Sequence, residues 1–155
     1  MSEKAAAALE IYQGILGEEE GVGEWLEIDQ DRINMFADAT LDHQFIHIDE
    51  EKAAQTPFGG TIAHGFLSLS MLVKMTEGEG VVPENVVMGI NYGFDKVRFL
   101  MPVRAGKRVR AHRELLSVDQ KDDNRFLLKH AVTVEIEGEE TPALVAEWLG
   151  MMVVG

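Results

Sequence analysis

Two side chains that can exchange protons lie five positions apart in the segment 40–49. Asp42 carries a carboxylate and His47 an imidazole, and both follow a segment with the pattern of a helix. On an irregular loop the two can point at one water molecule, and histidine gains and loses a proton near neutral pH. The pair therefore predicts acid–base chemistry on water. The spacing alone is weak support, because a chain with five histidines and 27 acidic residues easily produces it by chance.

A glycine-rich segment supplies the second chemical feature. Residues 59–65, with the sequence GGTIAHG, lead directly into an apolar stretch with the composition of a buried helix. The first N–H groups of a helix have no partner within it and lie at the positive end of its dipole. The Gly65 N–H is therefore expected to stabilise an oxyanion, such as the enolate of a thioester. The alternative is that Gly65 only allows close packing and that His64 is a hydrogen-bonded core residue.

Other chemistries have less support in the sequence. The absence of cysteine excludes disulfides, thiolate zinc sites and cysteine nucleophiles. Asp42, His43, His47 and His64 could in principle bind a metal ion, but their spacing matches no metal-binding signature, so no metal is expected. The sequence contains no P-loop, nucleophile elbow or dinucleotide fingerprint. The Ser68 hydroxyl is expected to bond to its own helix rather than act as a nucleophile.

The elements that would hold these residues can be predicted from hydrophobic periodicity. Residues 62–75 carry one formal charge, Lys74, and a helix that is apolar on nearly all sides must be enclosed by protein. Residues 125–136 alternate apolar and polar side chains, which is typical of an antiparallel strand with one solvated face. Weaker strand patterns cover the segments 86–91, 94–100, 107–118 and 143–154.

These patterns predict an α+β hot-dog fold, in which a curved antiparallel sheet wraps around one long buried helix. The edge strands of such a sheet are commonly covered by a second copy, so a homodimer is expected. Ahead of these elements, a helix is predicted from Ala5 to a stop near Gly17, followed by a strand at 22–28. Asp29 is expected to cap a helix that leads to Asp42. The acidic run at 18–21 is interpreted as part of a solvated loop.

Length and charge limit the possible partners. The 155 residues, of which 46% are hydrophobic, predict one folded domain over 1–155. The net charge of −13 argues against nucleic acid and anionic lipid as partners. The sequence shows neither an apolar run of about 18 residues nor the pattern of a signal peptide, so a cytoplasmic protein is expected. Seven of the 14 basic residues nevertheless lie within 96–113, which indicates either a solvated strand face or a site for a small phosphorylated ligand.

Three motifs together resemble a known family. They are FADATLDHQFIHID at 36–49, PFGGTIAHGFL at 57–67, and a third made of NYG at 91–93, VRF at 97–99 and PV at 102–103. Their order and spacing resemble the MaoC-like dehydratases, the group of the (R)-specific enoyl-CoA hydratases, and within it the nodulation protein N-like branch. The resemblance spans about residues 24 to 110.

The resemblance implies a hot-dog dimer that acts on acyl-CoA thioesters without a cofactor or a metal. It would add water to a trans-2-enoyl-CoA to give the (R)-3-hydroxyacyl-CoA, or remove it again. By position, Asp42 and His47 would hold the water and move its protons, and the Gly65 N–H would bind the thioester oxygen. From its charge, and not from the family motifs, the basic segment from Lys96 to Arg113 is then expected to meet the phosphates of CoA. The further residues expected to contact the substrate are Gln44, Phe45, His64, Ser68 and Arg98.

The chain departs from the usual hydratase pattern, Gly-Asp-x-Asn-Pro-(Ile/Leu)-His, at Leu41, Gln44 and Phe45. The nodulation-like branch also has Gln and an aromatic residue here, so these changes suggest a distinct substrate. Two alternatives remain open. One is an acyl-CoA thioesterase, whose carboxylate commonly lies on the central helix, where this chain has none between Gly65 and Thr76. The other is a non-catalytic module that binds acyl-CoA or an acyl carrier.

Overall fold

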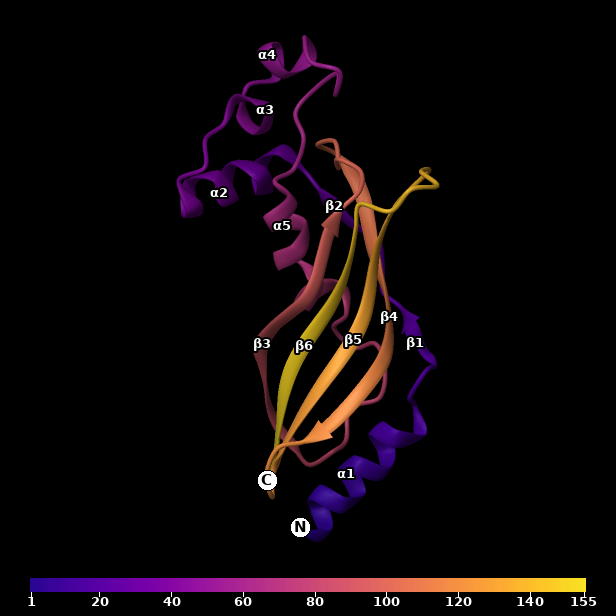
Figure 1. Cartoon of the computed structure of the whole chain (residues 1–155). Coiled ribbons are helices and arrows are strands. Elements are labelled where there is room, and N and C mark those ends of the chain that lie inside the picture. Colours follow the sequence, from indigo (N-terminus) through magenta and orange to yellow (C-terminus); the bar gives the residue numbers. More distant parts are fainter.

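The computed structural model of residues 1–155 contains one antiparallel sheet of six strands (Figure 1). In chain order the strands are β1 (Glu19–Val22), β2 (Leu26–Ile28), β3 (Val86–Phe99), β4 (Lys107–Gln120), β5 (Arg125–Ile136) and β6 (Leu144–Val154). They are arranged in the order β1-β4-β5-β6-β3, and β2 also pairs with β4. The second half of the chain therefore forms the body of the sheet, and β3 lies at its edge.

Six helices accompany the sheet. They are α1 (Glu3–Gly14), α2 (Gln30–Thr40), α3 (Phe45–Ile48), α4 (Glu50–Ala54), α5 (Gly65–Ser70) and α6 (Leu72–Met75). Figure 1 shows α2, α3 and α4 gathered at one end of the sheet, whereas α1 lies at the other end, near both termini. None of these helices has the length and apolar character needed to cross a membrane.

The structure confirms an α+β chain with an antiparallel sheet, and β5 confirms the clearest strand pattern. Its alternate side chains are buried, namely Phe126, Leu128, His130, Val132, Val134 and Ile136. The two strands predicted at 86–91 and 94–100 are one strand, β3, whose register against β6 shifts between Asn91 and Gly93. Asp29 caps α2 as predicted, since its Oδ1 accepts a hydrogen bond from the Arg32 N–H at 2.8 Å.

The prediction of one long buried helix over 62–75 is wrong. Helical structure begins only at Gly65 and is divided at Met71 into the short helices α5 and α6. The backbone before Gly65 is extended instead, because a neighbouring segment takes up its hydrogen bonds. Ile62 forms a β-bridge with Arg104, and the Ala63 N–H donates to the carbonyl oxygen of Val103 at 2.7 Å.

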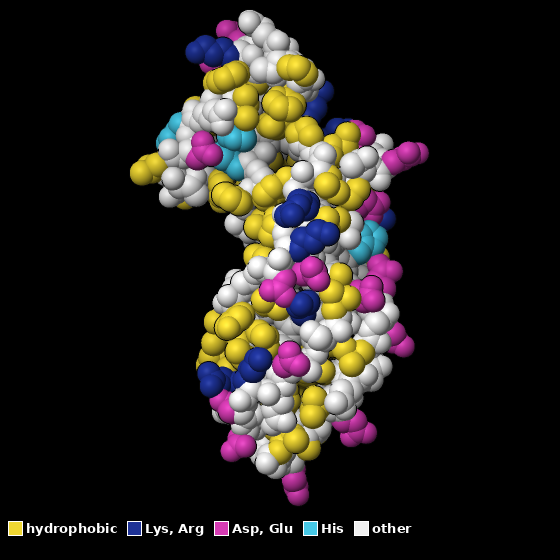
Figure 2. All heavy atoms as spheres, viewed as in Figure 1, with side chains coloured by type: hydrophobic (Ala, Val, Ile, Leu, Met, Phe, Trp, Pro, Cys, Tyr) yellow, Lys and Arg dark blue, Asp and Glu magenta, His cyan; other side chains and the backbone are white.

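The helical segment is also not enclosed within a single chain. Phe66 on α5 is 66% exposed, and Val73 on α6 is similarly open. The neighbouring edge strand β3 exposes the large apolar side chains Val87, Met88, Ile90, Tyr92 and Phe94. Figure 2 shows hydrophobic side chains gathered over the part of the molecule where β3 lies in Figure 1. An open apolar surface of this kind typically marks an interaction site. We call it the β3 face.

Two separate hydrophobic clusters form the core. The larger, of 15 buried residues, joins the sheet to α2, α5 and α6 and includes Ala111 and Val132. The smaller, of seven, packs α1 against the far end of the sheet and includes Leu115 and Leu128. The first cluster supports the end of the sheet where α2 and α5 lie, and the second holds the N-terminal helix α1 against the sheet.

A buried ion cluster lies on the sheet between these two clusters, and it corrects the prediction of a solvated loop at 18–21. That segment forms most of β1, and the Glu20 side chain is only 3% exposed. Glu20 Oε2 lies 2.7 Å from His130 Nε2 and 3.2 Å from Arg113 Nε. Burial, followed by the nearby Glu20 carboxylate, raises the pKa of Tyr12 to about 12. Glu20 is thus a structural residue of the interior.

Candidate active site

A sharp turn after α2 delivers Asp42 to the site. Leu41 ends the helix with φ at 64°, in the left-handed region that favours glycine. This explains why the related hydratase pattern has glycine here, and it means that Leu41 holds a strained conformation. The short helix α3 follows and carries His47, so a turn and a single helical turn place the two residues near each other.

The structure brings Asp42, His47 and His64 together. Each offers one ligand-type atom, and these atoms all lie within 4.8 Å of one another. The two imidazole rings are stacked, with their centroids 3.8 Å apart and their planes at 22°. His47 and His64 are buried, whereas the Asp42 side chain is 52% exposed. The Asp42 carboxylate is therefore open to solvent, whereas the two imidazoles are shielded from it.

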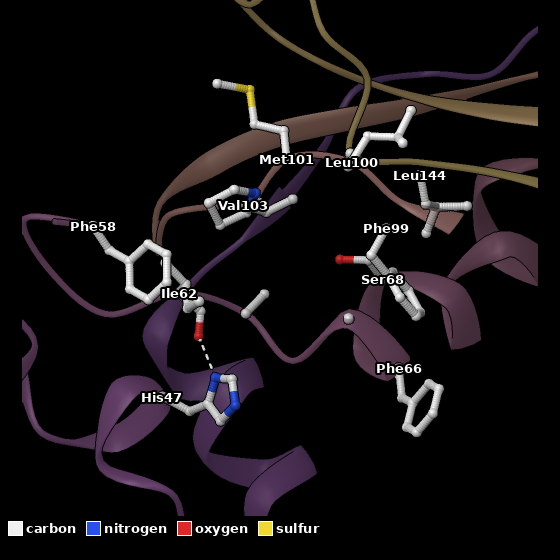
Figure 3. A pocket seen from close by; sticks show the side chains of 14 residues that line it. His47, Phe58, Ile62, Phe66, Ser68, Phe99, Leu100, Met101, Val103 and Leu144 are labelled. Atoms are coloured by element: carbon white, nitrogen blue, oxygen red, sulfur yellow. Dashed lines mark hydrogen bonds between the residues drawn. The ribbon is translucent and has the colours of Figure 1, made fainter. Parts of the chain in front are cut away.

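The hydrogen bond of His47 determines which ring nitrogen is free. Its Nδ1 lies 2.7 Å from the carbonyl oxygen of Ile62 (Figure 3). A carbonyl only accepts, so Nδ1 must carry the hydrogen and Nε2 keeps a lone pair when the ring is neutral. Burial lowers the pKa of His47 below its ordinary 6.5, and the nearby His64 adds to this, while the Ile62 bond and Asp42 oppose it. His47 thus has the form of a neutral base.

His64 is only partly satisfied as a core residue. Its Nε2 donates to the backbone oxygen of Asp42 at 3.0 Å, and its buried Nδ1 has no hydrogen-bond partner in the chain. Three such groups could be considered for a catalytic zinc ion, which needs nitrogens about 2.0–2.1 Å away. The lone pairs of stacked rings lie in nearly parallel planes and do not converge on one point. The arrangement therefore favours proton transfer over metal binding.

A cavity of about 400 Å³ opens beside His47, a size suited to a small-molecule site. Ten of its 14 lining residues are hydrophobic, and none is acidic. Figure 3 shows Phe58 and Ile62 on one side of it and Phe66 and Phe99 on another. His47, Gly65 and Ser68 are also among its lining residues. The cavity is thus apolar, with a few polar groups.

Gly65 has a free N–H and also packs closely against a neighbouring ring. Its N–H, in the first turn of α5, donates to no acceptor within the chain. A Cβ at this position would lie 2.9 Å from Cε1 of Phe99, so close packing also requires glycine. The Ser68 hydroxyl does not bond to its own helix as expected. Ser70 does so, donating to the Phe66 oxygen at 2.7 Å, whereas Ser68 lies in the cavity wall.

The other predicted substrate contacts lie outside the cavity wall. Gln44 occupies the N-cap position of α3 without a side-chain capping bond, and its backbone N–H donates to Asp42 Oδ1 at 3.3 Å. Phe45 follows it and is half-exposed. Arg98 precedes Phe99 on β3, and because successive strand side chains alternate, it lies on the other face. Apart from Ser68, the residues of the wall that lie outside the three motifs are Leu100, Met101, Ala143 and Leu144, which have no signal of their own.

The basic segment divides into paired and unpaired residues. Carboxylates from β1 or from the β5 end of the sheet bind Arg108, Arg110 and Arg113. Arg104 has no acidic partner, and its guanidinium donates to the Gly59 oxygen at 2.9 Å. Gly59 is next to Phe58 of the cavity wall. Arg104 is therefore a positive charge beside the cavity, whereas three of the seven basic residues of the segment pair with carboxylates of the sheet.

Comparisons with known proteins agree with this fold. A solved structure, the monoamine oxidase regulatory protein from Archaeoglobus fulgius, superposes with a TM-score of 0.76 at 26% identity, covering 94% of this chain and 95% of that one. Nodulation protein N of Rhizobium leguminosarum bv. viciae is 48% identical over 135 residues, 86% of this chain and 84% of that protein. The 3-hydroxyacyl-thioester dehydratase Z of Mycobacterium tuberculosis is 47% identical over 131 residues, 84% of this chain and 86% of that protein. The family model of the MaoC like domain matches residues 13–137. The chain therefore belongs to the MaoC-like dehydratase family.

Proposed function

We propose that this chain catalyses the reversible (R)-specific hydration of trans-2-enoyl thioesters, with CoA as the carrier. One observation carries the proposal. A neutral His47, whose imidazole lies near the Asp42 carboxylate, lines the same apolar cavity as the unpaired N–H of Gly65. A relative named as a 3-hydroxyacyl-thioester dehydratase supports this class of reaction.

In the proposed reaction a water molecule is held between the Asp42 carboxylate and Nε2 of His47. Nε2 takes one proton of the water while the water oxygen forms a bond to C3 of the enoyl group. The electron pair of the C2=C3 bond moves to the thioester oxygen as an enolate, and the Gly65 N–H stabilises that charge. The imidazolium then returns the proton to C2. Asp42 accepts a hydrogen bond from the water and favours the cationic ring.

An assay of two products tests this proposal against hydrolysis. Purified protein with crotonyl-CoA and longer enoyl-CoAs is expected to consume the ultraviolet absorbance of the conjugated enoyl thioester, without releasing a thiol. Chiral analysis of the 3-hydroxyacyl product is expected to give the (R) form. Release of free CoA would indicate a thioesterase, although neither α5 nor α6 carries a carboxylate. Tight binding without turnover would indicate a binding module.

The pH dependence of the reaction follows from His47. Because burial lowers its pKa below 6.5, the base is expected to be neutral at pH 7. The low-pH limb of kcat/KM should therefore lie below pH 6.5 and report this group. The same shift stabilises the folded protein above pH 6.5, and that contribution is lost as the pH falls through the folded-state value. A limb above pH 6.5 in the pH–rate profile would contradict the assignment.

Arg104 is expected to bind a phosphate of CoA. Its replacement by Ala should raise KM for crotonyl-CoA about tenfold, the effect of losing one hydrogen bond to a charged group. The matched substrate is crotonyl-N-acetylcysteamine, which has no phosphate, so its KM should not change. An equal rise for both substrates would show that Arg104 only supports the Gly59 turn. Arg98→Ala tests the other predicted arginine, and Lys121→Ala is the control.

We also propose that the β3 face is covered by a second copy of this chain. β3 is an edge strand, so its backbone groups can extend the sheet, and the exposed side chains of β3, α5 and α6 supply apolar area beside it. Phe66, which is exposed there, also lines the cavity, so a partner would reach the site. Sedimentation is expected to show a dimer, and Tyr92→Asp is expected to weaken it. A monomer at micromolar concentration would contradict the proposal.

A further inference from the structure

Polar residues outside the cavity form a closed ring of bonds around His47, and sequence reasoning did not identify them. The ring begins at the backbone. Nε2 of Gln30, at the start of α2, donates to the carbonyl oxygen of His47 at 2.7 Å. The same nitrogen donates to Oδ1 of Asn34 at 2.9 Å, so both amide hydrogens of Gln30 are used. This fixes the orientation of the amide, because the reverse orientation would set two oxygens against each other.

The ring continues through a buried hydroxyl. With its nitrogen facing His47, Gln30 turns Oε1 toward Thr61, whose hydroxyl lies 2.5 Å away. Because Gln30 Oε1 is an acceptor, the Thr61 hydroxyl must donate the hydrogen of this bond. Thr61 is fully buried, and its N–H donates to Glu50 Oε2 at 3.4 Å. The same carboxylate oxygen lies 2.8 Å from the Thr61 hydroxyl oxygen, where it competes with Gln30 for the single hydroxyl hydrogen.

Thr61 closes the ring through the chain itself. The next residue, Ile62, is the one whose carbonyl oxygen accepts the hydrogen of His47 Nδ1 at 2.7 Å. In addition, the Ile62 N–H donates to the Ile46 oxygen at 3.0 Å. The path therefore runs from the His47 backbone through Gln30 and Thr61 to Ile62, and back to the His47 ring. It links the backbone position of His47 to the oxygen that sets its ring orientation.

We propose that Gln30 and Thr61 are positioning residues that keep His47 in its Nδ1–H form, with the Nε2 lone pair directed at the water. The inference rests on the proposed function for its catalytic consequence, but the hydrogen-bond ring does not depend on it. Neither side chain touches the cavity. Without the ring, only backbone bonds hold the segment that carries the Ile62 carbonyl, and the imidazole has more freedom to rotate or to exchange its tautomer. Loss of the ring lowers the rate of the proton-transfer step more than it lowers substrate affinity.

Thr61→Val tests this inference, because it removes the hydroxyl while nearly keeping the shape. We expect kcat to fall about 10- to 100-fold, the effect of a misplaced catalytic group, with KM changed no more than about twofold. Thr61→Ser keeps a hydroxyl and is expected to restore kcat to within about threefold of the wild-type value. Gln30→Glu is a second variant, which replaces the donor with an acceptor and should give the same loss. The matched control is Thr76→Val, since Thr76 is also buried and donates only to Leu72 at 2.7 Å.

A measurement that does not depend on turnover separates the two proposals. Nitrogen NMR of the imidazoles, with His47 assigned by its loss in His47→Asn, is expected to show Nδ1–H in the wild type and a mixture of tautomers in Thr61→Val. Wild-type tautomer and wild-type kcat in both Thr61→Val and Gln30→Glu would overturn the inference. Equal losses in Thr61→Val and Thr61→Ser would do so too. If the wild type hydrates no enoyl thioester, the proposed function fails, while the tautomers still decide this inference.

Discussion

Asp42→Asn and His47→Asn are each expected to lower the rate of enoyl-CoA hydration by about 10²- to 10⁴-fold, the usual contribution of a positioned acid or base. The amide that replaces the His47 imidazole cannot take a proton from water. The amide that replaces the Asp42 carboxylate neither bears the charge that favours the imidazolium nor accepts two strong bonds. Asp42→Asn preserves the side-chain shape, and His47→Asn keeps an amide nitrogen near the position of the imidazole Nδ1. The loss should therefore appear in kcat, while thermal unfolding changes little.

A neighbouring histidine supplies the control for this result. His43 is exposed, and its Nε2 lies 2.8 Å from Oδ1 of Asp38, away from the cavity. His43→Asn is therefore expected to keep wild-type kcat and KM in the same steady-state assay. Unchanged activity in both Asp42→Asn and His47→Asn would remove these residues from the proposed mechanism. Equal losses in all three variants would point to a general disturbance of the loop.

Glu20→Ala is expected to cause the largest loss of stability, about 3–5 kcal/mol in the free energy of unfolding. The change leaves Arg113 and, when protonated, His130 as buried charges without a carboxylate. The measurement is urea unfolding at a fixed protein concentration, since a dimer makes the midpoint depend on concentration. The m-value is compared between variants to check that both unfold in the same way.

The matched variant for Glu20 is Glu137→Ala. Glu137 also pairs with an arginine, Arg108, but both side chains are largely exposed. Water replaces such a partner readily, so the unfolding midpoint is expected to stay near the wild-type value. If Glu20→Ala destabilises the protein no more than Glu137→Ala, the buried ion cluster is not important for stability.

The elements that local patterns could predict are those whose structure depends on near neighbours in the chain. The alternation of β5 and the capping of α2 by Asp29 are of this kind. The prediction of a long helix was wrong because composition cannot show that the Ala63 N–H is bonded to Val103, 40 positions away. The prediction of a solvated loop at 18–21 was wrong for a similar reason. Its pattern is that of a loop, but β4 and β5 supply an arginine and a histidine to bury Glu20.

The candidate site could be predicted to a similar extent. Asp42, His47 and Gly65 lie in short motifs, so their proximity could be proposed from the sequence. The structure places Asp42 beside His47, which lines the cavity together with Gly65. Gln30 and Thr61 could not be found this way, because they are 31 positions apart and meet only in the folded chain. The far wall of the cavity, formed by residues 143–144, likewise depends on how the sheet returns to the site.

The division of the core into two clusters has a consequence for motion. The cluster that holds α1 shares no residue with the one that supports the catalytic end, and charged side chains lie on the sheet between them. Transient detachment of the N-terminal helix would therefore expose only its own small cluster, as a subglobal opening. Amide hydrogens in α1 can then exchange with solvent faster than those of β5, while the geometry around His47 persists. The N-terminal helix can therefore open transiently while the arrangement of the candidate site is kept.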